Sequence, residues 1–154
     1  MLAVGQKQKN SGADTFVNQL REDTGIKMIP RKSPLEFMYK ALARNRILTL
    51  ASDQDAKKRG IFVKFFSLPA STTKGAARFH LECGSPLIFV TCHLEKQNNH
   101  VLDILPVPTD SNSNIESITQ SFTLMLEKII TAYPEQYFWF HRRWKTKPPE
   151  TESI

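Results

Sequence analysis

Short apolar runs alternate along this chain with longer segments in which apolar residues recur every three or four positions. The runs 26–30, 47–51 and 61–66 have the length of strands, whereas 11–25 and 33–45 carry the periodicity of helices. The run at 47–51, ILTLA, is almost wholly apolar, which is typical of a strand covered on both faces. Helices that alternate with such strands predict an α/β fold, a layered αβα domain with a mixed, mostly parallel sheet.

The helix expected over 33–45 carries a clear start signal. Ser33 suits the cap position, Pro34 suits the first helical position, and Glu36 completes a capping box. One face of this helix is expected to be buried through Leu35, Met38 and Leu42.

The second half of the chain predicts a helix, a hairpin and a longer helix. The first helix is expected over 71–84, with a hydroxyl residue at its start and Gly84 just past its end. The apolar runs 85–94 and 100–107 are expected to pair as antiparallel strands across a polar loop. The longer helix carries an apolar stripe made of Ile115, Ile118, Phe122, Leu126 and Ile129.

The composition indicates a folded chain with an anionic partner. Apolar residues make up 40% and charged residues 23%, which excludes a disordered composition. The formal net charge is +6 and the isoelectric point about 9.4. A balance this basic fits nucleic acid, a phosphorylated lipid headgroup, an anionic membrane surface or an acidic protein, without choosing among them.

Neither the cysteines nor the histidines form a metal-ligand pattern. Cys83 and Cys92 lack C-x-x-C spacing and are expected to be buried free thiols. No run approaches the ~18 to 20 apolar residues that a bilayer-spanning helix needs. The sequence therefore predicts no metal site, no cofactor and no transmembrane segment.

Two charged clusters follow predicted strands, where ligands bind in open α/β sheets. Asp53, Gln54 and Asp55 come directly after the run at 47–51 and are followed by Lys57, Lys58 and Arg59. This loop suits the orientation of a polar headgroup or a catalytic imidazole, or it is a solvated turn. Arg31 and Lys32 lie between a strand and a helix start, which fits a phosphate site or two exposed cations.

The closing segment YPEQYFWFHRRWKTKPP, residues 133–149, interleaves aromatic rings with cations. Rings that stack on bases beside cations that follow phosphates would make a single-strand nucleic-acid platform. The same mixture suits a membrane interface, where rings lie at headgroup depth and cations meet lipid phosphates. In a third interpretation the aromatic residues close the core and the cations are simply exposed.

Four stretches resemble, in the right order, the lipid A biosynthesis acyltransferases, which are bacterial lauroyl and myristoyl transferases. PEQYFWFHRRWK resembles the terminal signature of that family. MIPRK resembles its basic segment, DQDAKKRGIFVKFFSLPASTTKGAARF its central block, and GSPLIFV the strand that follows. The similarity extends from about residue 15 to about residue 147.

The resemblance implies an acyltransferase with a glycerolipid-acyltransferase-like fold. Such enzymes move a fatty acyl group from acyl-carrier protein to a hydroxyl of a lipid A precursor, at the cytoplasmic face of the inner membrane, and relatives acylate other glycolipids. A histidine in an H-x-x-x-x-D/E motif takes the hydroxyl proton as the oxygen attacks the thioester carbonyl, and the acid orients the imidazole. The implied partners are acyl-carrier protein, a glycolipid acceptor and a membrane surface, with no nucleic acid.

The catalytic motif of that family is absent from this sequence. The fifth residue after each histidine is Ser85 for His80, Asn98 for His93, Leu105 for His100 and Thr146 for His141. In the family the motif and a hydrophobic anchor lie upstream of the first matched stretch. We therefore expect residues 1–147 to be the C-terminal portion of one acyltransferase domain, residues 148–154 to be a solvated tail, and the chain to be peripheral to the membrane and inactive alone.

The resemblance also gives the charged clusters roles in binding substrate. The cations would meet phosphates of the acceptor, the phosphopantetheine arm or the acidic carrier protein, and the acidic loop would border the catalytic pocket. For His141 a role as a hydrogen-bonded packing residue stays open. The predicted substrate-binding residues are Arg31, Lys32, Asp53, Gln54, Asp55, Lys57, Lys58, Arg78, His141, Arg142 and Arg143, and no catalytic residue is predicted.

An alternative function follows from the missing motif. The chain would then be a non-catalytic module that binds anionic lipid or a membrane surface. A nucleic-acid binder ranks behind both.

Overall fold

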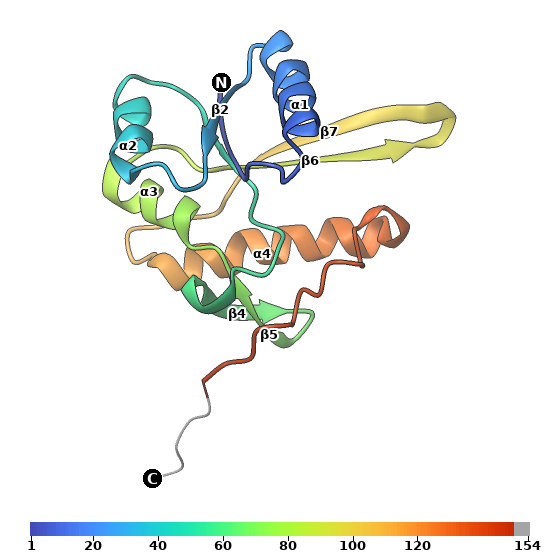
Figure 1. Cartoon of the computed structure of the whole chain (residues 1–154). Helices are drawn as coiled ribbons and strands as arrows, with labels where there is room; N and C mark the ends of the chain where they lie inside the picture. Colours follow the sequence, from blue (N-terminus) through green and yellow to red (C-terminus); the bar gives the residue numbers. More distant parts are fainter. Residues whose placement is uncertain (150–154) are drawn as a thin grey trace. The chain divides into compact units, whose positions relative to one another are not determined.

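The computed structural model describes residues 1–149 and divides into two compact units, Met1–Ala51 and the remainder from Ser52 onward. Each unit has its own strands and helices (Figure 1). The expected single domain over 1–147 stays a prediction. In the tail predicted over 148–154, Pro148 and Pro149 are exposed, and residues 150–154 lie outside the described part.

The first unit is a small parallel sheet with two helices. Its strands β1 (Leu2–Gly5), β2 (Lys27–Pro30) and β3 (Leu48–Leu50) are ordered β2-β1-β3, and β1 runs parallel to both neighbours. The helices α1 (Ser11–Asp23) and α2 (Leu35–Ala43) connect them. Because all three strands are parallel, their carboxyl ends meet at the same edge of the sheet.

Helix α2 begins differently from its sequence signal. Pro34, not Ser33, occupies the cap position, and no side chain caps the helix. The expected apolar stripe is only partly buried, because Met38 is buried whereas Leu35 is 45% exposed. Ala41 takes the second buried position on this helix. The capping prediction is therefore wrong, although the helix itself is present.

As far as residue 149, the second unit contains two antiparallel hairpins, two α-helices and short 3₁₀ turns. The hairpins are β4 (Ile61–Phe65) with β5 (Leu68–Thr72), and β6 (Ile88–Glu95) with β7 (Asn99–Pro106). The helices are α3 (Gly75–Cys83), which ends at the left-handed Gly84, and α4 (Ile115–Ala132). The turns are η1 (Lys57–Arg59), η2 (Lys96–Asn98) and η3 (Pro134–Gln136).

The expected mixed α/β class is confirmed, with parallel pairs in the first unit and antiparallel pairs in the second. The predicted hairpin over 85–107 is also confirmed. Strand β5 was not predicted, since residues 71–72 were assigned to a helix that in fact begins at Gly75. The expectation of buried thiols is wrong: Cys83 and Cys92 are free but exposed.

The tight turn between β4 and β5 explains why that hairpin was missed. Phe66 and Ser67 form a two-residue loop, and both have positive φ, 48° and 64°. Such turns normally signal themselves with Asn-Gly, because other residues are strained there. Here the conformation is held from outside, because the Phe66 N–H donates to Oε1 of Glu127 on α4 at 2.9 Å.

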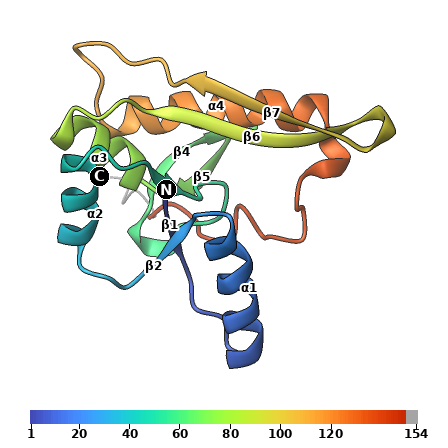
Figure 2. The ribbon, with the colours of Figure 1, turned by 90° about the horizontal axis from the view of Figure 1, so that it is seen from above.

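Helix α4 organises the second unit by contributing to two cores. Ile118 and Phe122 pack with Ala77 of α3 and with Val107, and Phe89 of β6 lies against this cluster. Farther along the helix, Ile130 packs with Phe65 and Ala70 of the β4–β5 hairpin, together with Leu126, Tyr137 and Trp144. Figure 2 shows the β6–β7 hairpin extending along α4.

Two glutamine side chains complete the edges of the strands beside α4. The amide of Gln120 accepts from the Lys64 N–H at 2.8 Å and donates to the Lys64 carbonyl at 2.9 Å. Gln136 makes the same pair with Leu94, at 2.7 and 2.8 Å. Each amide substitutes for a neighbouring strand, so backbone groups at the edges of β4 and β6 are satisfied.

We predict that Ile118→Ala lowers the free energy of unfolding by about 3 kcal/mol, because this side chain is fully buried and its loss leaves a cavity. Leu124→Ala is the matched control on the same helix. Leu124 is 46% exposed, and its loss is expected to cost less than about 1 kcal/mol. Urea denaturation measures both, and equal losses would contradict the orientation of α4.

Candidate functional site

The closing segment binds the acidic loop that follows β3. The Tyr137 hydroxyl donates to the Asp53 carbonyl at 3.1 Å, and the Asp55 N–H donates to Nε2 of His141 at 2.8 Å. Thr146 donates from its hydroxyl to Oδ2 of Asp55 at 2.9 Å. Three side chains from the end of the chain therefore fix the position of a loop more than eighty residues earlier in the sequence.

Arg143 lies at the centre of this cluster and is 1% exposed. Its Nη1 donates to the Ser71 carbonyl at 2.8 Å and its Nη2 to the Thr72 hydroxyl at 2.5 Å, both at the end of β5. The guanidinium also lies over the Phe65 ring, 5.1 Å from its centroid. A planar group with several donors suits this site, which needs two hydrogen bonds and a stacked face at once.

Burial lowers the pKa of Arg143, and Tyr137, Asp55 and Asp53 oppose that shift. Neither aspartate forms a direct ion pair with the guanidinium within residues 1–149, so their effect acts through space. Burial likewise raises the pKa of Tyr137, with Asp53 adding to the shift and Arg143 opposing it. The two acids of the loop therefore help to balance a buried positive charge.

His141 has a defined tautomer in this cluster. A backbone N–H can only donate, so Nε2 of His141 is the acceptor of the Asp55 N–H and carries no proton. Nε2 is thus already engaged by the backbone. His141 holds the acidic loop in place.

Several polar residues beside the cluster in sequence are exposed. Arg142 and Gln54 are exposed, as are all three residues of η1, Lys57–Arg59. The Ser71 hydroxyl donates to the Lys57 carbonyl at 2.6 Å, which ties η1 to β5. Consecutive residues of the signature, Arg142 and Arg143, therefore have opposite environments.

In the first unit, cations gather at the carboxyl edge of the parallel sheet. Arg31 and Lys32 follow β2, and the Arg31 N–H donates to the carbonyl of Gly5, the last residue of β1, at 2.8 Å. The loop after β1 carries Lys7 and Lys9, and it lines an open hollow together with Gln6, Gln8, Asn10 and Ala13. Sequence reasoning missed the two lysines, because β1 was not recognised as a strand of this sheet.

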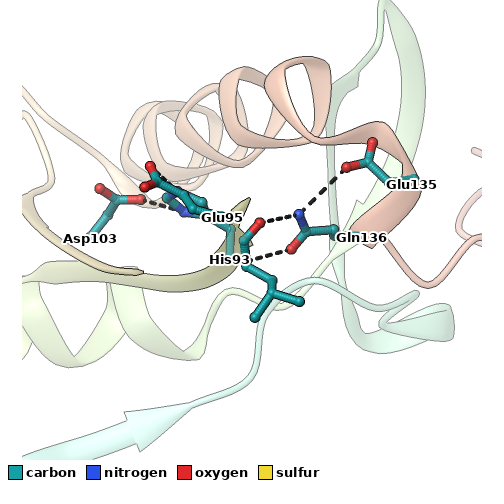
Figure 3. Close-up of polar contacts among 6 residues, drawn as sticks. His93, Glu95, Asp103, Glu135 and Gln136 are labelled. Atoms are coloured by element: carbon teal, nitrogen blue, oxygen red, sulfur yellow. Dashed lines mark hydrogen bonds and ion pairs between the residues drawn. The ribbon is translucent and has the colours of Figure 1, made fainter. Parts of the chain in front are cut away.

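A buried histidine lies between two acids on the β6–β7 hairpin (Figure 3). Nδ1 of His93 is 3.2 Å from Oδ2 of Asp103, without hydrogen-bond alignment, and Nε2 is 3.7 Å from Oε1 of Glu95. The ring stacks on Tyr133 at 4.1 Å between centroids. Because His93 is only 6% exposed and one face of its ring is covered by Tyr133, the imidazole gives a substrate hydroxyl little access.

The sequence profile described as bacterial lipid A biosynthesis acyltransferase matches residues 1–146. The chain belongs to the bacterial lipid A biosynthesis acyltransferase family. The match includes all four stretches that resemble this family, so the resemblance is confirmed.

Individual relatives carry related names. The chain is 34% identical over 133 residues to the lipid A biosynthesis lauroyltransferase of Escherichia coli strain K12, which covers 82% of this chain and 42% of the relative. It is 29% identical over 161 residues to the lipid A biosynthesis palmitoleoyltransferase of the same strain, a match that covers 100% of this chain and 51% of the relative. It is 24% identical over 128 residues to the phosphatidylinositol mannoside acyltransferase of Mycobacterium tuberculosis strain CDC 1551 / Oshkosh, a match that covers 80% of this chain and 40% of the relative. The chain spans about half the length of these curated relatives.

In this family member, the predicted binding residues lie in separate parts of the structure. Asp53, Asp55, His141 and Arg143 share one hydrogen-bonded cluster. Arg78 lies on α3, where its Nε pairs with Oε1 of Glu82 at 2.7 Å. Arg31 and Lys32 belong to the first unit. Their roles in substrate binding stay predictions.

Residues 1–149 contain no group of three or more His, Cys, Asp or Glu side chains arranged to hold a metal ion. In the same range, no helix has both the length and the apolar character needed to cross a bilayer.

We predict that Arg143→Ala lowers the free energy of unfolding by about 3 kcal/mol, since it removes two buried hydrogen bonds and the packing over Phe65. Arg143→Lys is also expected to destabilise the chain, because an ammonium group lacks the planar fork. The matched control is Arg142→Ala, with a change within about 0.5 kcal/mol. Chemical denaturation compares the three variants. A loss for Arg142→Ala as large as that for Arg143→Ala would show that the two environments are assigned wrongly.

Proposed function

We propose that this chain acts in the transfer of a fatty acyl group from acyl-carrier protein to a hydroxyl of a lipid A precursor or a related glycolipid. The observation that carries the proposal is the family match over residues 1–146. The relatives are named as transferases that act in lipid A biosynthesis or on phosphatidylinositol mannoside. The chemistry would be attack of the acceptor oxygen on the thioester carbonyl, with a base taking the proton.

The cationic edge of the first unit is the proposed site for an anionic part of a substrate. Lys7, Lys9, Arg31 and Lys32 all follow the carboxyl ends of adjacent parallel strands. That is the edge where ligands of open α/β sheets bind, and several cations there suit a phosphate group. The phosphate would belong to the glycolipid acceptor or to the phosphopantetheine arm of the carrier.

The cluster of the second unit supports the same function indirectly. Asp53 and Asp55 are held by Tyr137, His141 and Thr146, which favours a fixed loop over a mobile solvated turn. We propose that the cluster gives the loop a defined shape, while Gln54, Lys57 and Lys58 remain exposed for contact with substrate or carrier protein. The proposed location is the cytoplasmic face of the inner membrane, with the chain bound peripherally.

We predict that Arg31→Gln/Lys32→Gln weakens binding of a phosphorylated lipid A precursor in detergent micelles by about tenfold, since two charge-assisted contacts are lost. The matched control is Lys27→Gln/Arg46→Gln. These cations are also exposed in the first unit, but Lys27 begins β2 and Arg46 precedes β3, at the amino edge of the sheet. Fluorescence anisotropy with a labelled precursor measures the affinities. Equal weakening by both double variants would reject a site at the carboxyl edge.

We predict no turnover when the purified 154-residue chain is mixed with acyl-loaded carrier protein and lipid A precursor. None of its four histidines has an acid five positions later, and the one histidine beside two acids, His93, is buried. Mass spectrometry of the lipid fraction detects an added acyl chain, with the Escherichia coli lauroyltransferase as the positive control. An acylated product from this chain alone would overturn the prediction.

The non-catalytic alternative makes a different prediction for binding. A general anionic-lipid module would bind phosphorylated and unphosphorylated lipids in anionic vesicles with similar affinity. The Arg31→Gln/Lys32→Gln variant would then lose affinity for both lipids equally. A nucleic-acid binder would retain oligonucleotide binding at physiological salt, although purely electrostatic binding falls steeply there. These assays separate the three classes.

A further inference from the structure

The closing segment places alternate side chains on opposite sides. Tyr137, His141 and Arg143 turn inward and are bonded to the protein. Between them, Phe138 is 61% exposed and Phe140 is 90% exposed, and Arg142 is exposed as well. Trp139 lies at the boundary: it is 48% exposed, and its Nε1 donates to the Pro134 carbonyl at 2.7 Å.

The two outward phenylalanines form one apolar projection. Their ring centroids are 5.9 Å apart. The backbone beneath them is a hydrogen-bonded turn, because the His141 N–H donates to the Phe138 carbonyl at 3.1 Å and the Trp139 N–H to the Tyr137 carbonyl at 2.9 Å. Tyr137 before the rings and His141 after them are both bonded to the acidic loop, and these bonds hold Phe138 and Phe140 on the outer side.

Exposed positive charge follows this projection along the chain, and Glu135 precedes it. Arg142, Lys145 and Lys147 are exposed, and residues 137–149 contain no acid. Asp53 and Asp55, which the segment contacts through hydrogen bonds, are partly buried: Tyr137 donates to the backbone carbonyl of Asp53 and Thr146 to the carboxylate of Asp55. The outward surface thus combines exposed aromatic rings with cations.

We propose that Phe138 and Phe140 insert into the interface of an anionic membrane while Arg142, Lys145 and Lys147 contact lipid phosphates. Aromatic rings favour the headgroup region, and basic residues beside them are attracted to anionic lipid. Charge complementarity selects this partner. The β6–β7 hairpin of the second unit also exposes apolar side chains, among them Ile88, Val90, Leu94, Leu102 and Ile104, but its two strands contain no Lys or Arg. The inference deepens the proposed function, since a glycolipid acceptor lies in a membrane, but vesicle binding requires no acyl transfer.

The test is sedimentation of the 154-residue chain with vesicles of phosphatidylcholine and phosphatidylglycerol in equal parts. Phe138→Ser/Phe140→Ser is expected to reduce binding by about tenfold or more, because two rings can no longer leave water. Arg142→Gln is expected to reduce it by about fivefold, an effect that added salt weakens. Vesicles of phosphatidylcholine alone are expected to bind the unmodified chain weakly.

Two further variants keep the test specific. Phe16→Ser/Phe37→Ser removes the same residue type at 65% and 60% exposure from the first unit, and it is expected to leave vesicle binding unchanged. Phe140→Trp puts a fluorophore at the tip of the projection, and its emission is expected to shift to the blue on addition of anionic vesicles. The acidic carrier protein and an oligonucleotide serve as competing partners.

Several results would overturn the proposal. The Phe138/Phe140 variant could bind vesicles like the unmodified chain, or Val90→Thr/Ile104→Thr could abolish binding in its place. Size-exclusion chromatography would show whether the unmodified chain forms a dimer that the Phe138/Phe140 variant does not form. That result would assign the projection to contact with a second copy of the chain. Loss of carrier-protein or oligonucleotide binding, with vesicle binding retained, would assign it to those partners.

Discussion

The buried guanidinium of Arg143 is the interaction on which the C-terminal part of the molecule depends. A charge at 1% exposure is costly unless it is hydrogen-bonded. Here the carbonyl of Ser71 accepts from Nη1 and the hydroxyl of Thr72 from Nη2, whereas the buried Nε has no hydrogen-bond partner. Both acceptors lie at the end of β5, a strand whose turn is strained and held by Glu127. The closing segment, the β4–β5 hairpin and α4 are therefore mutually dependent parts of one unit.

This dependence explains the mixture of rings and cations at the end of the chain. A segment that only closed the core would bury its aromatic residues, and one that only contacted a membrane would need no buried arginine. Here the inward residues fix the acidic loop at Asp53 and Asp55, and the outward residues face solvent. The signature of the acyltransferase family thus serves two purposes through alternate positions, a structural one toward the protein and a proposed binding one away from it.

Much of the fold follows from local patterns, whereas the site depends on contacts distant in sequence. The β6–β7 hairpin and α4 were predictable from strong periodicity, although α4 buries Ile130 where the predicted stripe had Ile129. The β4–β5 turn was not, since Phe66 and Ser67 adopt positive φ under external support and carry no turn signal. Nor could adjacent arginines be told apart, because the burial of Arg143 is set by β5. The His93–Asp103 contact spans two strands, and a search along the sequence for a fixed spacing cannot find it.

The measurement that tests this account most directly is hydroxyl-radical footprinting of the unmodified chain in solution, read by mass spectrometry over residues 133–149. After correction for the intrinsic reactivity of each residue type, the account predicts rapid oxidation of Phe140 and Phe138 and protection of Tyr137 and Trp144. The pattern follows from exposed rings on one side and hydrogen-bonded rings on the other. Equal oxidation of all four rings would contradict the division of the segment into inward and outward residues.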